Sequence, residues 1–299
     1  DGRRNFYALA TDWLIGERAK LEVDANYQTS AQRSASGYQL LGASMLPQHV
    51  DRTQMLGYQR WQQPVGIDST NLSALHTYDF SPAWQSRVSA SHSRSVIDDN
   101  VAFAYGCYYA EACWDGSVPG NYFAPNGDYD IYDYRSPDDT RRNQQLRAEL
   151  RGRFATGAIG HQLVLGADYF RRSVDKRRNV NEYVGTGNIH DDAVPQFDPS
   201  PLQPGPSVRR VDSRQKALFV LDRMQLADDW QWLAGGRFVR LDERAWDKRG
   251  NPERDSRVSR FLPQTALIWS ANAQLNLYAS YVRGIALGQE APFWTSNEG

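Results

Sequence analysis

The feature that most constrains the fold is a two-residue alternation of apolar and polar side chains that recurs along the chain. In Lys20–Gln28, the residues Leu21, Val23, Ala25 and Tyr27 alternate with charged or amide side chains. A period of two belongs to a β-strand, in which successive side chains point to opposite faces. A helix of this composition would carry charges on every side, so the alternation predicts strands. The same pattern returns in 145–154, 162–168 and 275–281.

The connections between these segments are alternately short and long. The short ones predict tight turns, and the long ones are polar stretches. Outer-membrane β-barrels have this asymmetry, with short turns at one end and long loops at the other. The expected turns are 16–18, 81–83, 156–158, 228–229 and 271–273, and the expected loops are about 31–70, 97–141, 179–212 and 244–257. About ten strands are predicted: 6–14, 19–30, 71–80, 84–96, 143–154, 161–174, 214–226, 230–243, 259–270 and 274–286.

Hydropathy is compatible with such a barrel. The mean hydropathy of −0.65 is too low for membrane helices, and no run of about 18 apolar residues occurs. A spanning strand needs only about 9–11 residues with every second one facing lipid. The modest apolar side chains suit lipid contact and the charged face suits a hydrated lumen. The predicted fold class is therefore all-β, an antiparallel up-and-down transmembrane β-barrel segment of about ten strands.

Aromatic content and charge narrow the function. The chain has 16 Tyr, 11 Phe and 9 Trp, which barrels place in girdles at both membrane interfaces; an aromatic-rich soluble β-protein is the alternative. The net charge of −1 gives no reason to expect nucleic acid. No catalytic motif is present, the five histidines form no cluster with ligand spacing, and we assign no catalytic and no metal-binding residue.

The two cysteines, Cys107 and Cys113, lie close together in a stretch rich in Gly, Tyr and Trp. This spacing predicts a small disulfide-closed loop in an oxidising compartment. Metal binding competes with this interpretation, but no second Cys or His pair stands at zinc spacing.

The aromatic residues beside this disulfide are the best functional candidates. A closed loop loses less entropy when it presents rings to a ligand, and phenol or indole groups stack on and hydrogen-bond to aromatic or chelate-type compounds. We predict a ligand-facing surface of Tyr105, Tyr108, Tyr109 and Trp114. A lid that only resists proteolysis is the alternative. In the lumen-facing series, Arg147, Arg151 and Arg153 either attract anions or pair with Glu149 and neighbouring acids.

Four segments resemble strands of TonB-dependent outer-membrane siderophore receptors. Residues 160–169, GHQLVLGADY, resemble the family's H-x-L-x-x-G-x-D-Y strand. Residues 217–224, ALFVLDRM, are similar to its G-L-Y-x-Q-D strand, although Ala217 and Leu221 replace the usual Gly and Gln. Residues 233–238, LAGGRF, resemble L-x-x-G-x-R-Y, and 277–284, LYASYVRG, followed by 288–292, resemble L-Y-A-S-Y-S-x-G.

The resemblance implies a 22-stranded barrel plugged by an N-terminal domain in the outer membrane of a Gram-negative bacterium. Such a receptor binds a ferric siderophore in its extracellular loops and imports it with energy from the TonB–ExbB–ExbD complex. It has no resident cofactor, because the iron travels inside the siderophore, and its other contact is outer-membrane lipid.

Two parts of that family pattern are missing from this sequence. No plug domain or TonB box precedes the first strand, and the chain stops at Asn297-Glu298-Gly299 without further strands. We therefore expect 1–299 to be part of a receptor barrel, contacting TonB only through an absent N-terminal region. Its open edges would favour aggregation, and alone it should not transport.

Two rival functions remain at this stage. One is a passive porin or an adhesin-type barrel, in which the loops only gate or bind partners. The other is a secreted soluble β-enzyme acting on carbohydrate, which would need a carboxylate pair in one cleft. The transport interpretation predicts that the chain is not an enzyme.

Overall fold

A computed structural model describes residues 2–48, 50–114, 116 and 119–285. Within these residues the chain forms eleven β-strands and one short 3-10 helix, η1 (Glu111–Cys113). No helix in this part of the chain is long and apolar enough to cross a membrane. The strands are β1 (Gly2–Ile15), β2 (Ala19–Gln32), β3 (Val65–Ser81), β4 (Trp84–Ala104), β5 (Asp128–Thr156), β6 (Ile159–Arg177), β7 (Val180–Asn188), β8 (Ser207–Ala227), β9 (Trp230–Trp246), β10 (Pro252–Asn272) and β11 (Leu275–Val282).

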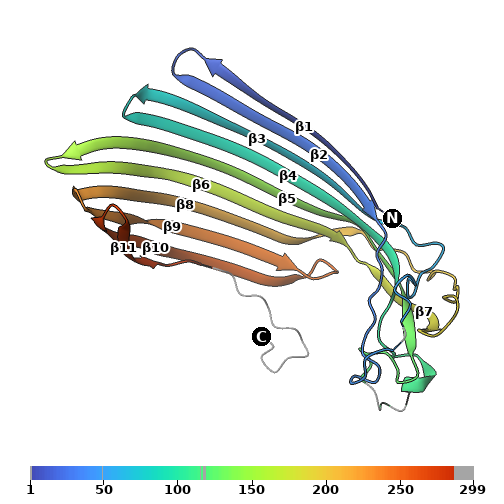
Figure 1. Cartoon of the computed structure of the whole chain (residues 1–299). Coiled ribbons are helices and arrows are strands. Elements are labelled where there is room, and N and C mark those ends of the chain that lie inside the picture. The colour runs from blue at the N-terminus through green and yellow to red at the C-terminus, as the bar shows by residue number, and fades with distance from the viewer. Residues whose placement is uncertain (1, 49, 115, 117–118, 286–299) are drawn as a thin grey trace.

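The strands make one antiparallel sheet in which, apart from β7, neighbours in sequence are neighbours in space. Its order is β1-β2-β3-β4-β5-β6-β8-β9-β10-β11, and β7 pairs separately with β5. Figure 1 shows a broad curved sheet whose first and last strands do not meet. The predicted all-β, up-and-down and unclosed sheet is confirmed.

Short turns and long connections lie at opposite ends of the sheet (Figure 1). The turns take two or three residues: 16–18, 82–83, 157–158, 228–229 and 273–274. The loops 33–64, 105–127 and 189–206 lie at the other end, as the alternating connections predict. The segment 191–206, with its five prolines, lies within the predicted loop 179–212 and forms no strand.

The strands are longer than the alternation predicts. β5 begins at Asp128 instead of residue 143, β4 continues to Ala104, and β7 arises inside a stretch that we expected to be a loop. At about 3.3 Å per residue, the 29 residues of β5 reach about 95 Å, whereas crossing a bilayer takes only about 9–11 residues. Where a strand extends beyond the lipid, neither of its faces has to be apolar. Its sequence therefore does not alternate between apolar and polar residues.

Two further strand boundaries differ from the predicted ones. The predicted loop 244–257 shrinks to 247–251 because β9 and β10 extend into it. The last strand covers 275–282, whereas residue 286 and the 288–292 run lie outside the described residues.

The register separates an apolar face from a polar face. Leu150 lies beside Leu165, and Leu165 beside Val220. All three belong to a band that also contains Leu218 and Phe238, which are 64% and 51% exposed. Side chains this apolar and this open to the surroundings suit contact with hydrocarbon. We call this the outer face.

The opposite face, which we call the inner face, carries ion pairs. Arg237 donates two hydrogen bonds to Asp168, at 2.6 and 2.7 Å. Glu149 lies between Arg147 and Arg151, with N···O distances of 2.5 and 2.8 Å. Two of the three lumen arginines predicted from the sequence are therefore paired with Glu149, as one of the two interpretations proposed. A face of this polarity fits a water-filled interior.

Aromatic rings collect on the outer face close to the short turns. Trp84 stacks on Phe154 at 6.1 Å between ring centroids, Phe154 stacks on His161 at 4.7 Å, and Trp230 stacks on Trp269 at 5.8 Å. His161 Nδ1 lies 2.6 Å from a carboxylate oxygen of Asp222, the acid that interrupts the apolar face of β8. Such rings mark the membrane–water interface of barrels.

Candidate ligand-binding surface

The long connections fold together into a compact cap beyond the membrane-spanning part of the sheet. Its apolar core combines the loop residues Leu41, Leu56 and Phe123 with the strand residues Tyr129 and Ile131. Phe123, Tyr129 and Ile131 are completely buried. The loops are therefore an ordered structure with a hydrophobic core of its own, packed on the protruding ends of β4 and β5.

Hydrogen bonds tie the cap together across long sequence distances. The buried Gln59 donates to the carbonyl of Pro195 at 2.9 Å and accepts from the Phe197 N–H at 2.7 Å. Ser36 Oγ accepts from the Ala104 N–H at 3.0 Å. Buried polar groups with partners on both sides fix one arrangement of the loops.

A β-bulge decides which residues of β5 face inward within the cap. Between Ile97 and Asp99 on β4, the partners on β5 change from Asp139 to Ser136, so β5 carries one extra residue there. The backbone of Asp138 has a φ of 59°, a left-handed conformation that bulges use. The extra residue reverses the alternation on β5, and Tyr132 and Tyr134 thereby fall on the inner face.

β4 has no such insertion, so Phe103 stays on the same face as Arg87, which lies opposite Glu149 of the inner face. Phe103 lies opposite Tyr132, with their ring centroids 5.7 Å apart and nearly parallel. The bulge thus brings aromatic rings from two neighbouring strands together, on a face continuous with the lumen.

Seven rings form one connected group, which we call the aromatic surface. From the Phe103–Tyr132 pair the contacts run to Tyr105 at 6.5 Å and to Tyr183 of β7 at 6.3 Å. Aromatic pairs favour centroid separations of about 4.5–7 Å. The aromatic surface consists of Phe103, Tyr105, Tyr108, Tyr109, Tyr132, Tyr134 and Tyr183.

Three of the four predicted ligand-facing residues belong to it. Tyr105 stacks on Tyr108 at 6.4 Å, and Tyr109 stacks on Tyr183 at 4.7 Å. Tyr105, Tyr108 and Tyr109 are 40%, 54% and 55% exposed, so their faces are open to a ligand. Trp114 is 71% exposed and only borders the group, donating from Nε1 to the Tyr109 carbonyl at 2.9 Å.

Four members of the surface were not predicted from the sequence: Phe103, Tyr132, Tyr134 and Tyr183. All four belong to strands where we expected loops. The high tyrosine content of 105–134 pointed to the region, but only the register and the bulge show which rings meet.

The predicted disulfide between Cys107 and Cys113 is present and closes the loop that carries Tyr108 and Tyr109. Both cysteines are buried in a second small core with Ala110 and Ala124. The Cys107 N–H donates to the Gly120 carbonyl at 2.8 Å, joining the loop to the next segment. The covalent closure limits how far the two tyrosines can move.

A buried carboxylate holds the same loop in place through hydrogen bonds. Asp130 is fully buried and accepts hydrogen bonds from the N–H groups of Tyr109 at 3.0 Å and Ala110 at 2.9 Å. It also accepts from the Tyr132 hydroxyl at 3.2 Å. Burial raises the pKa of Asp130 above its ordinary value, although these three donors act in the opposite direction.

Two tyrosines of the aromatic surface are held in their neutral form. Burial and the nearby Asp130 raise the pKa of Tyr132. Burial, followed by the neighbouring Tyr105 and Asp130, raises the pKa of Tyr108. Both tyrosines therefore stay protonated at neutral pH. Each side chain offers a flat ring and a hydroxyl that donates hydrogen bonds.

Comparison with known proteins gives the family. Residues 9–297 match the family described as "TonB dependent receptor-like, beta-barrel". The chain is 24% identical over 185 residues to the ferrichrome outer membrane transporter/phage receptor of Escherichia coli K12, a match that covers 57% of the chain and 24% of that protein.

Two solved structures are similar in fold. The ferric preacinetobactin receptor BauA of Acinetobacter baumannii superposes with a TM-score of 0.73 at 20% identity, covering 100% of this chain and 42% of that one. The ferripyoverdine receptor of the Pseudomonas aeruginosa outer membrane gives a TM-score of 0.72 at 18% identity, covering 94% of this chain and 35% of that one. The chain thus spans less than half the length of these relatives.

The match to the family covers nearly the whole chain, and the described sheet has the matching architecture. The family comprises receptors and transporters of the Gram-negative outer membrane, not enzymes. An apolar outer face, a girdle of rings near the short turns and an ion-paired inner face are what that location requires. The chain belongs to the TonB-dependent receptor β-barrel family.

Proposed function

We propose that the receptor to which this chain belongs binds a ferric siderophore on its extracellular side and imports it with energy from the TonB–ExbB–ExbD complex. The iron travels inside the siderophore as part of the substrate, and the barrel holds no resident cofactor. The relatives support this: the names of three describe transport or binding of ferrichrome, ferric preacinetobactin and ferripyoverdine.

The aromatic surface is the observation that carries the proposal. It joins rings from β4, β5, β7 and the disulfide loop on the face that continues into the lumen, where a captured ligand would have to pass. Neutral phenols with raised pKa values, such as Tyr108 and Tyr132, are poor direct ligands for iron. They suit stacking and hydrogen bonding to the organic part of a chelate.

Binding to the complete receptor in detergent tests the ligand-binding part. The ligand is a panel of ferric hydroxamate and ferric catecholate siderophores, and binding is followed by quenching of tryptophan fluorescence. We expect the double variant Tyr108→Ala/Tyr109→Ala to bind its siderophore at least tenfold more weakly, because aromatic stacking contributes about 0.5–1.5 kcal/mol per ring pair beyond the buried area.

Leu46→Ala is the matched control, since Leu46 is an exposed cap residue, 71% accessible, outside the aromatic surface. Unchanged affinity in the tyrosine variant would remove these rings from the binding site. Uptake of radioactive ferric siderophore in cells with and without TonB tests the energy source. Uptake that persists without TonB would favour the passive porin instead.

A further inference from the structure

The two segments that supply the aromatic surface contain acidic residues but no basic ones. Residues 100–134 hold five Asp or Glu and residues 179–206 hold four, whereas neither segment contains a Lys or an Arg. The two segments thus hold nine of the 35 acidic residues of the chain and none of its 34 Lys and Arg residues. All seven rings belong to these segments, so the aromatic surface lies in a strongly acidic part of a chain whose net charge is −1.

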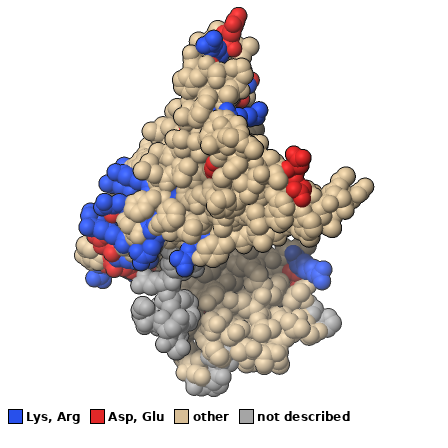
Figure 2. Space-filling model, turned by 90° about the vertical axis from the view of Figure 1, so that its left-hand side faces the viewer, with Lys and Arg blue, Asp and Glu red and all other residues tan. Residues whose placement is uncertain are grey.

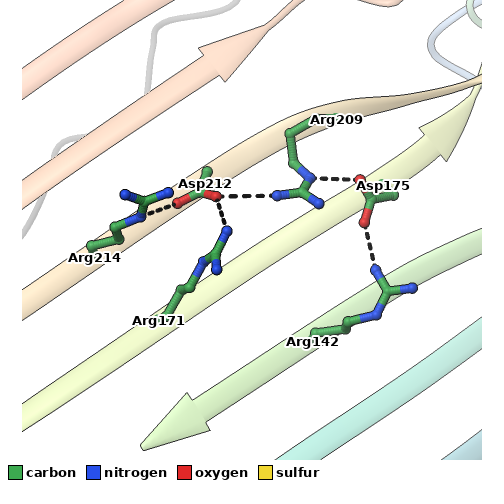
Figure 3. A network of polar contacts seen from close by, with 6 residues as sticks. All are labelled: Arg142, Arg171, Asp175, Arg209, Asp212 and Arg214. Atoms are coloured by element: carbon green, nitrogen blue, oxygen red, sulfur yellow. Dashed lines mark hydrogen bonds and ion pairs between the residues drawn. The ribbon is translucent and has the colours of Figure 1, made fainter.

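The basic residues gather on the sheet instead, where acids are paired with them. In Figure 2 lysine and arginine side chains gather on one flank of the molecule. Figure 3 shows Asp212 and Asp175 of the sheet linked through Arg209, with N···O distances of 3.1 and 2.5 Å. Both carboxylates have further arginine partners: Arg171 and Arg214 for Asp212, and Arg142 for Asp175. Arginine therefore balances the negative charge in this part of the sheet.

The carboxylates of the two acidic segments are not balanced in this way. Among the residues of these segments that the structure describes, only Asp133 forms a salt bridge, with Arg135 at 3.1 Å. Asp133 and Arg135 alternate with Tyr132 and Tyr134 along β5, so this pair lies on the face of the strand opposite to the rings. The pair therefore brings no positive charge to the aromatic surface.

Three arginines of the cap belong to a connection that covers the same opposite face of β5. They lie in 33–64: Arg33, Arg52 and Arg60. This connection packs through Leu41 and Leu56 into the apolar core that contains Tyr129 and Ile131. These two core residues alternate with the ring residue Tyr132 along β5, so they face away from the aromatic surface. The first inner-face cation of β5 beyond the rings is Arg141, which is bound to Asp139 at 3.2 Å.

Negative groups act directly on the exposed rings. After burial, Tyr105 and Asp130 raise the pKa of Tyr108, and no cation in the described part of the chain lowers it. Glu111 follows Tyr109 by two residues in the disulfide loop, is exposed, and forms no salt bridge with any described residue. An ammonium group at this surface would therefore meet the negative faces of neutral rings and a nearby carboxylate, and both attract a cation.

Ferric chelates differ in charge according to their donor groups. Each catecholate brings two negative charges, so a ferric tris-catecholate remains strongly anionic. Each hydroxamate brings one, so a ferric tris-hydroxamate is neutral, and a free amino group on its chain makes it a cation because alkylamines are protonated at neutral pH. An acidic surface repels the first kind, tolerates the second and attracts the third, since the sign of the local field determines which charges accumulate.

We propose that the aromatic surface selects a ferric tris-hydroxamate that carries a protonated amino group. The hydroxamate part of the chelate lies against the tyrosine rings, and Glu111 is the carboxylate that the ammonium group approaches. This inference rests on the proposed function of siderophore binding and specifies the chemical class of the ligand at the same surface.

Equilibrium binding to the complete receptor in detergent tests this. The probes are ferrioxamine B, which carries a protonated amine, its N-acetylated form, which is neutral, and ferric enterobactin, an anionic tris-catecholate. We expect ferrioxamine B to bind at least about fivefold more tightly than the acetylated form, and ferric enterobactin to bind most weakly. The preference should shrink when the salt concentration is raised from about 0.01 to about 1 M, because salt screens the interaction.

Equal affinity for ferrioxamine B and its acetylated form, or tighter binding of ferric enterobactin, would overturn the inference. In either case the receptor would still bind a ferric siderophore, so the proposed function would stand. If no member of the wider siderophore panel bound, both the proposed function and this inference would fail.

A charge reversal locates the carboxylate. Glu111→Lys should weaken the binding of ferrioxamine B at least about fivefold, while the affinity for the acetylated form stays nearly unchanged, which also verifies folding. Glu17→Lys is the matched control, because Glu17 is an exposed residue of the short turn 16–18 at the other end of the sheet. An equal loss for both chelates in Glu111→Lys, or the same effect in the control, would refute the role of Glu111.

Discussion

Asp130 is completely buried, and its carboxylate has a hydrogen-bonding role that an amide side chain does not fill as well. Its two oxygens accept from two consecutive backbone N–H groups and from a tyrosine hydroxyl. A carboxylate accepts at both oxygens, whereas an amide accepts at only one. The residue therefore holds the disulfide loop, and with it Tyr109, in a fixed position.

Replacing Asp130 by Ala should loosen the cap. The N–H groups of Tyr109 and Ala110 would lose their acceptor, and each buried donor left unsatisfied costs about 1–3 kcal/mol. We expect faster hydrogen exchange in 103–110 and weaker siderophore binding, while the sheet keeps its protection. Exchange measured by mass spectrometry on the complete receptor checks this, and unchanged protection in 103–110 would contradict it.

The cap should also respond to pH through the same residue. Folding raises the pKa of Asp130 above its ordinary value of 3.8, because burial disfavours the charged form. Its contribution to stability is then fully present below the unfolded pKa and is lost as the pH rises through the folded pKa. Asp51, in the same cap, has a pKa lowered chiefly by Thr53, so its contribution has the opposite sign.

The Asp130→Asn variant separates the two contributions. The asparagine amide does not titrate, so the gain of cap stability on acidification should be smaller in this variant than in the wild type. Hydrogen exchange corrected for its intrinsic pH dependence measures the difference. The same pH slope in both proteins would show that Asp130 has no raised pKa.

At the scale of single elements, the disulfide loop and the protruding strands work together. Cys107 and Cys113 lie six positions apart in the sequence. In the chain-entropy description a loop this short stabilises the folded state by about 2 kcal/mol. The glycine just upstream, Gly106, has a φ of +62°, and a Cβ there would clash with the Gly120 carbonyl oxygen. This backbone conformation therefore requires glycine at position 106.

The double variant Cys107→Ser/Cys113→Ser should consequently keep its barrel but lose about 2 kcal/mol of local stability in the cap. Limited proteolysis should cut the variant near residues 108–114 faster than the wild type, and siderophore affinity should fall. The wild type under reducing conditions is the control and should behave like the variant. Equal cleavage rates in all three samples would contradict this prediction.

At the scale of the whole molecule, the two faces of the sheet determine where the chain can reside. Leu165 of the outer face lies between Leu150 and Val220, whereas Val164 beside it faces inward. Membrane insertion depends on the outer residues, because hydrocarbon cannot solvate a charge. The inner residues contact water and tolerate charge.

Leu165→Arg should therefore destabilise the barrel by about 2–4 kcal/mol, the cost of arginine near the bilayer midplane. The matched control Val164→Arg, one residue away on the inner face, should cost much less. Urea titration of the complete receptor folded into vesicles measures both. Equal losses for the two variants would mean that the assignment of the faces is wrong.

Much of this architecture follows from the sequence by itself. Alternation in segments such as 20–28 determines a strand and its two faces, because the side-chain period of a strand is two regardless of its neighbours. The alternating short and long connections determine the up-and-down order and the end that carries the loops. The spacing of Cys107 and Cys113 was sufficient to predict their pairing.

Only the tertiary structure decided which distant residues meet. The bulge at Asp138 turns Tyr132 inward, and a one-residue insertion has no signature in a polar sequence without alternation. Tyr183 joins Tyr109 only because β7 pairs with β5. Residues on separate strands become neighbours only when the hydrogen-bonded ladder aligns them, so these contacts depend on strand register and not on spacing in the sequence.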